Sequence, residues 1–419
     1  MTTETTVLVD TTTPSATTET TVHTGEDDPT DDGESIPDEL LGVVVDLTAS
    51  GVIVRDGEVV VAGIDVASEG EANAAVIRVP LDGTAPTRTE LPNDAPSVTI
   101  ADAAAIDNTI VVVGHVVVEC AARGCYRERG AAWYSNDGGA SFFEVDTDSF
   151  TGQRQVRLTD IIATDPGFVA VGYDVTDGTR IVTATWTSPD GTNWTRGDDI
   201  EHPEWSIFPS TLAAVDDGAV LLANQTTCGT VNPNGPNGGV SPSGIGRDAR
   251  VFGSADGLDW ERVVGVFDQP EYSCDDVSDN HPDRVGILFG IDGEALIVRG
   301  DGAAFRGGVV GPMESSGTVP GTSDLFDLFD LFDLFVLDGE LVRAGVVAVD
   351  GETPFIVVST PAEDVRIGAT DVVVDRSLDD PRLLRLDRTQ DGLVVILSSK
   401  LRDADGDYQG TNAIVAYGS

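Results

Sequence analysis

The stretch Asp165-Pro-Gly167-Phe-Val-Ala-Val-Gly172 is one copy of a pattern that recurs along the chain and indicates its fold. Each variant places Asp or Asn, usually with Gly, in a turn and follows the turn with a run of Val, Ile, Leu or Ala. Seven variants are present, with turn positions at 57, 108, 167, 218, 293, 339 and 392. A turn followed by an apolar run is typical of a β-hairpin, and its repetition indicates an array of similar units.

The sequence around the quoted stretch predicts four strands in one unit. An apolar strand at 160–164 precedes the turn, a buried strand follows it, and two further strands are expected at 181–186 and 194–196. Four antiparallel strands in a unit of about 40–60 residues form the blade of a β-propeller. We therefore expect an all-β fold, a seven-bladed β-propeller of four-stranded antiparallel blades.

The later units follow the pattern less closely. The fifth has weak third and fourth strands around 303–321. Tandem Asp-Leu-Phe repeats occupy 324–335, and we expect part of them to supply the inner strand of the sixth blade.

The two ends of the array predict how the ring closes. The seventh unit stops after its third strand, 413–417, and an unassigned apolar strand at 41–46 precedes the first unit. We expect this N-terminal strand to be the missing outer strand of the last blade. It would leave no open sheet edge between the first and last blades.

Residues 1–40 differ in composition from the rest of the chain. They are rich in Thr, Asp and Glu and contain no Lys or Arg. Such a segment cannot bury enough apolar surface to offset the entropy lost on ordering. We expect a disordered stalk at 1–40 and a single propeller domain at 41–419. A Thr-rich acidic stalk commonly follows an export signal, and no signal peptide follows Met1, so we expect a start that was trimmed or lies upstream, and an extracellular or envelope-attached protein.

The charge balance excludes some classes of partner. The 419 residues contain 72 Asp and Glu against 24 Lys and Arg, a formal net charge of −48. Nucleic acids are bound through clustered cations, so a general nucleic-acid binder is excluded, and docking on an anionic membrane is disfavoured. No apolar run approaches the roughly 18 residues of a transmembrane helix. We expect a monomer.

The four cysteines are expected to form two disulfides, although four cysteines allow three pairings. Their spacing is unlike that of zinc ligands, and no His lies at a metal-ligand spacing. Cys228 and Cys274 fall in loops expected on one face, so we predict Cys228–Cys274 and Cys120–Cys125 in an oxidising compartment. Four unpaired thiols in a cytosolic protein is the alternative.

One acidic segment resembles part of a calcium loop. Asp403, Asp405 and Asp407 alternate as calcium ligands do, but no later Glu completes an EF-hand ligand set. A solvated hairpin tip is the other interpretation. We expect no bound metal or cofactor elsewhere.

Three units carry a sharper motif between their third and fourth strands. Its residues are Ser135, Asp137, Gly139 and Phe142; Ser188, Asp190, Gly191 and Trp194; and Ser254, Asp256, Gly257 and Trp260. Asp accepts hydrogen bonds from the turn backbone, Gly adopts positive φ, and the aromatic residue packs between blades. The motif resembles the Asp-box, or bacterial neuraminidase repeat, of sialidase-type β-propellers, with one residue fewer before the aromatic in the last two copies.

The resemblance implies a fold more than an activity. In that family the box is a structural turn on the face opposite the active site. Sialidases also carry an early Arg-Ile-Pro signature, three arginines, a Tyr/Glu nucleophile pair and an Asp acid. Here Arg78 precedes Val-Pro in an expected third strand, while Arg55 lies in a first strand without Ile-Pro. We assign no catalytic residue from the resemblance.

A binding site is expected on the face opposite the motif, which we call the top face. Loops between second and third strands and between blades emerge there. Three arginines within seven residues of one loop could hold a carboxylate or sulfate in bidentate fashion; local salt bridges are the alternative. A lone His and Trp in a second connection could equally serve packing. The candidate ligand-binding residues are Arg123, Tyr126, Arg127, Arg129, His202 and Trp205.

Two functions follow from these observations. The first is an extracellular binding or scaffold module without catalysis, which takes a glycan, an anionic small molecule or a protein on its top face. The alternative is a sialidase-like glycoside hydrolase.

Overall fold

The computed structural model describes most of the chain. The described residues are 19–21, 41–55, 57–66, 72–119, 126–150, 155–176, 180–202, 206–226, 247–267, 286–319, 333–337, 340–347, 355–359, 366–371, 378–390, 392–402 and 408–418. Apart from one short 3-10 helix, η1 (Thr147–Phe150), their regular structure is β-strand. None of these residues belongs to a helix with the length and hydropathy needed to cross a membrane.

The strands form seven antiparallel sheets, which we number in chain order. Sheet 1 contains β3 (Thr48–Arg55), β4 (Glu58–Val66), β5 (Ala72–Pro80) and β6 (Thr87–Glu90); sheet 2 contains β7 (Ser97–Ile106), β8 (Thr109–Glu119), β9 (Tyr126–Ser135) and β10 (Phe143–Glu144). Sheet 3 contains β11 (Val156–Thr164), β12 (Gly167–Thr176), β13 (Arg180–Ser188) and β14 (Thr195–Arg196); sheet 4 contains β15 (Ser206–Val215), β16 (Gly218–Thr226), β17 (Arg247–Ser254) and β18 (Glu261–Val263). Sheet 5 contains β19 (Gly286–Ile291), β20 (Glu294–Arg299), β21 (Ala303–Gly307) and β22 (Glu314–Thr318); sheet 6 contains β23 (Asp333–Leu337), β24 (Glu340–Val347), β25 (Phe355–Ser359) and β26 (Arg366–Asp371). Sheet 7 contains β27 (Leu378–Thr389), β28 (Gly392–Arg402) and β29 (Tyr408–Gly418), followed by β2 (Leu41–Val45) and β1 (Glu19–Thr21) from the N-terminal part.

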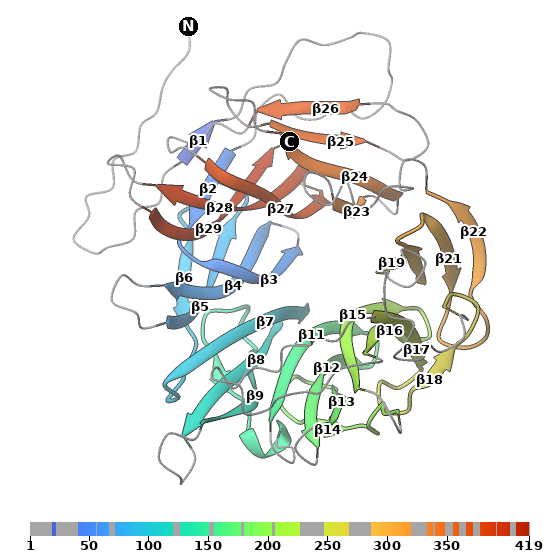
Figure 1. The fold of residues 1–419 in the computed structure, drawn as a ribbon. Coiled ribbons are helices and arrows are strands. Elements are labelled where there is room, and N and C mark those ends of the chain that lie inside the picture. The colour runs from blue at the N-terminus through green and yellow to red at the C-terminus, as the bar shows by residue number, and fades with distance from the viewer. Residues whose placement is uncertain are drawn as a thin grey trace, which may run out of the picture.

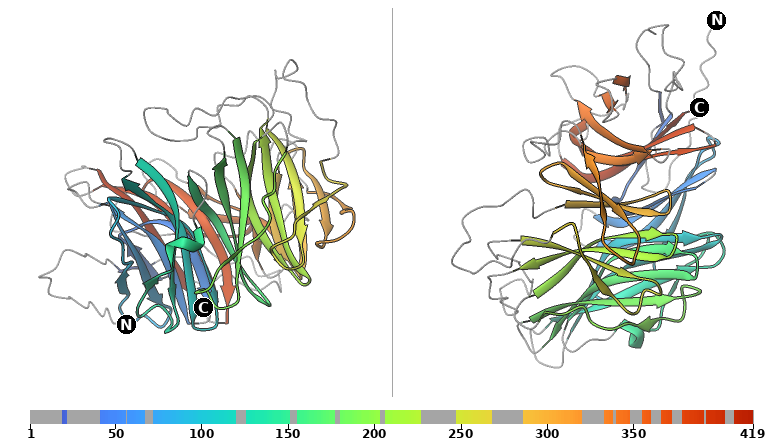
Figure 2. Two further views of the ribbon diagram at one scale, coloured as in Figure 1. Left: turned by 90° about the horizontal axis from the view of Figure 1, so that it is seen from below. Right: turned by 90° about the vertical axis from the view of Figure 1, so that its right-hand side faces the viewer.

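The seven sheets are arranged around a ring, and the first strand of each faces its centre (Figure 1). Figure 2 shows the same sheets from two other directions. Repeated antiparallel sheets placed radially in this way form a β-propeller.

The second strand of each sheet explains why the apolar runs after the turns are continuous. Successive side chains of a strand point to opposite faces, so a strand between two neighbouring sheets buries both sets. In β4, Val60 packs toward sheet 2 and Val61 toward sheet 7. Each neighbouring pair of sheets shares such a cluster, represented around the ring by Val60–Val112, Val111–Ala170, Val169–Leu221, Leu222–Ile297, Val298–Leu334, Val342–Val395 and Ile396–Val61.

The turn glycines are required where the first hairpin of a sheet packs against its own third strand. Gly167 and Gly218 have φ values of 144° and 147°. A Cβ at Gly167 would lie 2.3 Å from the Ser188 carbonyl oxygen, and one at Gly218 would lie 2.1 Å from that of Ser254. Only glycine fits both the backbone conformation and the close approach.

The N-terminal strand lies where the sequence predicts it. β2 pairs with β29 in antiparallel register, from Leu41 opposite Tyr417 to Val45 opposite Ala413. A difference from the expectation is β1, which adds a fifth strand to sheet 7 by pairing with β2 and belongs to the predicted stalk. Residues 1–18 and 22–40 lie outside the described part of the chain, so the stalk stays a prediction.

The two units with irregular sequences each form a four-stranded sheet. Sheet 5 obtains its third and fourth strands, β21 and β22, from within the range expected to be weak. In sheet 6 the end of the Asp-Leu-Phe repeats contributes residues 333–335 to the inner strand β23, as expected. The repeats before residue 333 lie outside the described residues.

Candidate functional site

The three motif turns share one hydrogen-bonding scheme on the face that we call the turn face. In each, the Ser hydroxyl donates to the Asp carboxylate and accepts a backbone N–H from a turn glycine. The Ser–Asp distances are 2.7 Å for Ser135–Asp137, 3.2 Å for Ser188–Asp190 and 3.1 Å for Ser254–Asp256. These turns join third and fourth strands, which is where the sequence places the motif.

The one-residue difference in length between the copies has a structural explanation. In the longer turn the Ser135 hydroxyl accepts the N–H of Gly139, four residues on. In the shorter turns the glycine is three residues on, and the indole N–H of the following Trp donates to its carbonyl, over 3.0 Å for Trp194 and 3.1 Å for Trp260. The aromatic side chains of all three turns pack against the preceding sheet.

The Asp carboxylates of these turns are stabilised in the charged form. The side chain and backbone of Ser141 donate to Asp137 and, together with Ser135, lower its pKa to about 2. Burial raises the pKa of Asp190, but hydrogen bonds from Asn193 and Thr192 outweigh it and lower the pKa overall. The backbone N–H groups of Asp259 and Leu258 lower the pKa of Asp256. These carboxylates are structural anchors of the turns.

The structure places only part of the predicted ligand-binding set. Arg127 and Arg129 alternate with Glu128 near the start of β9. Arg127 is exposed, whereas Arg129 forms an ion pair of 3.2 Å with Glu144 of the adjacent edge strand. His202 is partly buried in the connection after sheet 3.

Arg123, Trp205, the side chain of Tyr126, the four cysteines and Asp403–Asp407 lie outside the described residues, so their roles stay predictions.

The top end of sheets 2 and 3 instead brings together a cluster that the sequence did not single out. On β9 a Cβ at Gly130 would lie 3.0 Å from Val156, so this side of β9 faces sheet 3, and Glu128, two residues earlier, faces it too. The carboxylate of Glu128 accepts hydrogen bonds from both Nε and Nη2 of Arg157 on β11. This is a bidentate ion pair between two sheets, and the Glu128 side chain is only 12% exposed.

Aromatic rings extend this cluster to sheet 4. The Arg157 guanidinium carbon lies 5.7 Å from the ring centroid of Tyr173, its partner on β12. The Tyr173 ring packs edge-on against Phe208 of β15, with centroids 6.0 Å apart and planes at 71°. Arg157 and Tyr173 together therefore connect sheet 3 to sheets 2 and 4 at the top face.

The electrostatics of the cluster favour a charged Arg157 paired with Glu128, beside a neutral Tyr173 and a neutral His115. Burial disfavours the charge of Arg157, but its bonds to Glu128 raise its pKa overall. Burial raises the pKa of Tyr173 to about 12, so the phenol keeps its proton. Burial, with the nearby Arg157 charge, lowers the pKa of His115 to about 4, so this imidazole is neutral near pH 7.

The two arginines nearest to a sialidase signature meet at the opposite end of sheet 1. Arg55 and Arg78 both bind the carboxylate of Glu58, and the Arg78–Glu58 contact is 2.8 Å. Arg55 also donates to the Gly138 carbonyl oxygen in the first motif turn, at 3.2 Å. Arg55 thus joins sheet 1 to the turn face of sheet 2.

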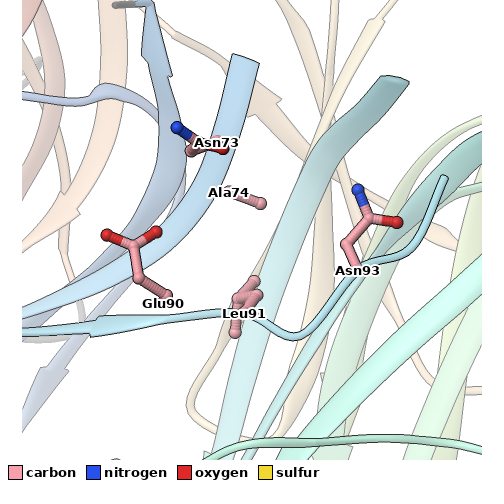
Figure 3. Close-up of a pocket in the computed structure, with 5 residues that line it drawn as sticks. All are labelled: Asn73, Ala74, Glu90, Leu91 and Asn93. Carbon is pink, nitrogen blue, oxygen red and sulfur yellow. The ribbon is translucent and has the colours of Figure 1, made fainter. Parts of the chain in front are cut away.

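A pocket of about 320 Å³ lies at the outer top edge of sheet 1 (Figure 3). Its lining consists of Asn73, Ala74, Glu90, Leu91 and Asn93. Two of its polar groups are engaged locally: Glu90 accepts from Arg88 at 2.7 Å, and Asn93 bonds the backbone of Ala95. Within the described residues, no group of three His, Cys, Asp or Glu side chains is placed to hold a metal ion.

Comparison with known proteins gives distant structural similarities. No protein-family model and no curated protein matches the sequence. The polysaccharide lyase Uly1 is similar over 88% of this chain and 90% of that chain, with 11% identity and a TM-score of 0.48. A Trypanosoma rangeli sialidase bound to the inhibitor DANA is similar over 92% of this chain and 58% of that chain, with 11% identity and a TM-score of 0.43. YCF48 bound to a D1 peptide is similar over 95% of this chain and 98% of that chain, with 14% identity and a TM-score of 0.44.

Proposed function

We propose that this chain is a closed seven-bladed β-propeller that binds an anionic ligand on its top face, without catalysis, outside the cell or on the cell envelope. The ligand class is an acidic glycan. Exposed Arg127 supports this proposal: it is next to Glu128 in β9, with its side chain on the opposite face of the strand, and it forms no ion pair with another described residue. In a chain of net charge −48, such a cation is a favourable contact for an anionic group.

The hydrogen bonding of Arg157 and the raised pKa of Tyr173 favour ligand binding over catalysis. The guanidinium of Arg157 is already engaged by Glu128 in a bidentate pair. A nucleophilic phenol would need an accessible deprotonated form, whereas the pKa of Tyr173 is raised to about 12. These groups attach β9, the strand that contains Arg127, to sheet 3.

The binding test compares charged and neutral oligosaccharides. Wild-type protein is titrated with a uronate-containing, a sulfated and a neutral oligosaccharide of equal length. We expect binding only to the charged probes, at least tenfold weaker in Arg127→Gln. Arg262→Gln removes the same charge from an exposed site on β18 and should leave binding unchanged. Equal binding of all three sugars, or equal loss in both variants, would refute the proposal.

A sialidase-like glycoside hydrolase is the second candidate, because one contact cluster contains Arg157, Glu128 and Tyr173. These are residue types that the family resemblance implies for a sialidase. A fluorogenic sialoside separates the candidates. We expect no turnover above the background of the Tyr173→Phe variant, and turnover that this variant abolishes would establish the hydrolase instead.

A further inference from the structure

The inner strands of sheets 2 and 3 each contain a β-bulge that is followed by an aspartate. The register of β7 shifts between Ile100 and Asp102, and that of β11 shifts between Leu158 and Asp160. A bulge adds one residue to the strand and redirects the side chains beside it. Both aspartates lie on strands that face the centre of the ring (Figure 1).

Each aspartate bonds the backbone of the next sheet. Oδ2 of Asp102 accepts the N–H of Ile161 in β11 at 3.3 Å. Oδ2 of Asp160 accepts the N–H of Leu212 in β15 at 2.7 Å. The two bonds join the inner strands of sheets 2, 3 and 4, which as first strands of separate sheets share no ladder hydrogen bonds.

Other joints of the ring use the same position with different chemistry. In β27 the residue after a bulge is Arg385, and it donates to the Val52 carbonyl oxygen of sheet 1 at 3.4 Å. In β3 the corresponding residue is Gly51, where a Cβ would lie 2.5 Å from the backbone nitrogen of Ala103. Of these four contacts between neighbouring sheets, those made by Asp102 and Asp160 are the ones that depend on a carboxyl group.

The Ile161 N–H that Asp102 accepts belongs to the residue directly after Asp160, so the two carboxyl groups lie close together and each influences the pKa of the other. Burial, and then the charge of Asp160, raise the pKa of Asp102 well above its usual value. Burial also raises the pKa of Asp160, while the bonds from Asp102 and from the Leu212 N–H act in the opposite direction. The pKa of Asp102 is raised the more strongly of the two, so Asp102 is the partner that we expect to hold the proton and offer it to Asp160.

Among the residues that the structure describes, no other charged side chain is a cause of either pKa shift. β15 contains no titratable side chain, and the titratable groups on the remaining strands packed against β7 and β11 contribute to neither pKa shift. These groups include Arg55, Glu58, His115, Glu128, Arg157 and Tyr173.

We propose that Asp102 and Asp160 form a proton-dependent joint, which holds sheets 2, 3 and 4 together around the ring centre while the pair shares a proton and weakens when both carboxyl groups are ionised. Two adjacent carboxylates would repel each other in a site from which water is largely excluded. The folded chain holds a proton on Asp102 that the unfolded chain has released. This contribution to stability is complete below about pH 4, near the unfolded pKa of Asp, and is lost as the pH rises through the raised pKa of Asp102.

Asp102→Asn tests the joint, because the amide keeps an oxygen for the Ile161 N–H and supplies a permanent N–H to Asp160. The urea midpoint of unfolding is measured from about pH 4 to about pH 9. We expect the wild-type midpoint to fall over this range and that of Asp102→Asn to fall much less. Asp198→Asn removes the same charge from an exposed position and should parallel the wild type. A fall in Asp102→Asn as large as that in Asp198→Asn would overturn the proposal.

A second measurement follows the two hydrogen bonds of the joint, from Ile161 to Asp102 and from Leu212 to Asp160. Amide hydrogen exchange at Ile161 and Leu212, corrected for the intrinsic pH dependence, should accelerate with pH in the wild type and stay constant in Asp102→Asn. If Asp102→Asn does not fold, Asp160→Asn makes the same comparison, since its amide would donate to Asp102 and leave one carboxylate in the pair. Protection that is independent of pH in the wild type would contradict the joint.

Discussion

Replacing Val43, Val44 and Val45 together with Ala should destabilise the propeller strongly, because these side chains fix β2 in sheet 7. They are 8%, 5% and 1% exposed. Val44 belongs to the cluster between sheets 6 and 7, and the other two face sheet 1. Each substitution removes two buried carbons at about 0.8 kcal/mol each, so the three together cost about 5 kcal/mol before any cavity cost. That is comparable with the whole free energy of unfolding of many domains, about 5–15 kcal/mol.

Urea denaturation followed by tryptophan fluorescence measures this loss. Val310→Ala is the matched control, since it removes the same carbons from a side chain that is 81% exposed, and it should leave the midpoint unchanged. We also expect the triple variant to bind hydrophobic dyes, because loss of β2 uncovers the outer edge of β29. A triple variant within about 1 kcal/mol of the wild type would refute the role of β2 in holding the ring together.

Three further predictions concern single groups. Trp133→Phe should cost about 1–3 kcal/mol in thermal or urea unfolding, because the buried indole N–H donates to the Pro92 carbonyl oxygen at 2.7 Å and that oxygen would lose its partner. Asp137→Asn should reduce the loss of stability on acidification, since the lowered pKa of Asp137 stabilises the fold above about pH 4 and the effect disappears as the pH falls through about 2; acid titration of circular dichroism measures it. Peptide mapping without reduction should recover a Cys228–Cys274 cross-link, and any other partner for Cys228 would show the predicted pairing to be wrong.

The repeated part of the fold could be predicted from the sequence because its signal is local. A turn followed by a continuous apolar run indicates a strand buried on both faces, and Val60 and Val61 pack in opposite directions as that interpretation requires. The N-terminal strand was predictable for a related reason: the last unit lacks a strand and an unassigned apolar strand is available. The short strand β1 was not predictable, since its Thr-rich sequence contains no apolar pattern.

The contacts between sheets carry no comparable local signal. Arg157 and Glu128 are 29 residues apart, and their pairing depends on which faces of β11 and β9 meet. The sequence singled out the arginines beside Glu128 because they stand out in an acidic chain, yet Glu128 makes the contact to the next sheet. Asp102 and Asp160 cannot be told apart in the sequence from the other members of a set of 72 acidic residues. What distinguishes them is the β-bulge directly before each one, which is visible only in the structure.

The closure of the ring by the N-terminal strand is tested most directly by amide hydrogen exchange of the intact protein, read by mass spectrometry for residues 41–45 and 413–417. Paired strands of one sheet exchange through the same opening event. We predict that both segments are protected to the same extent and lose protection together as urea is added. Exchange of 41–45 at the rate of an unstructured peptide, with 413–417 still protected, would contradict the closure.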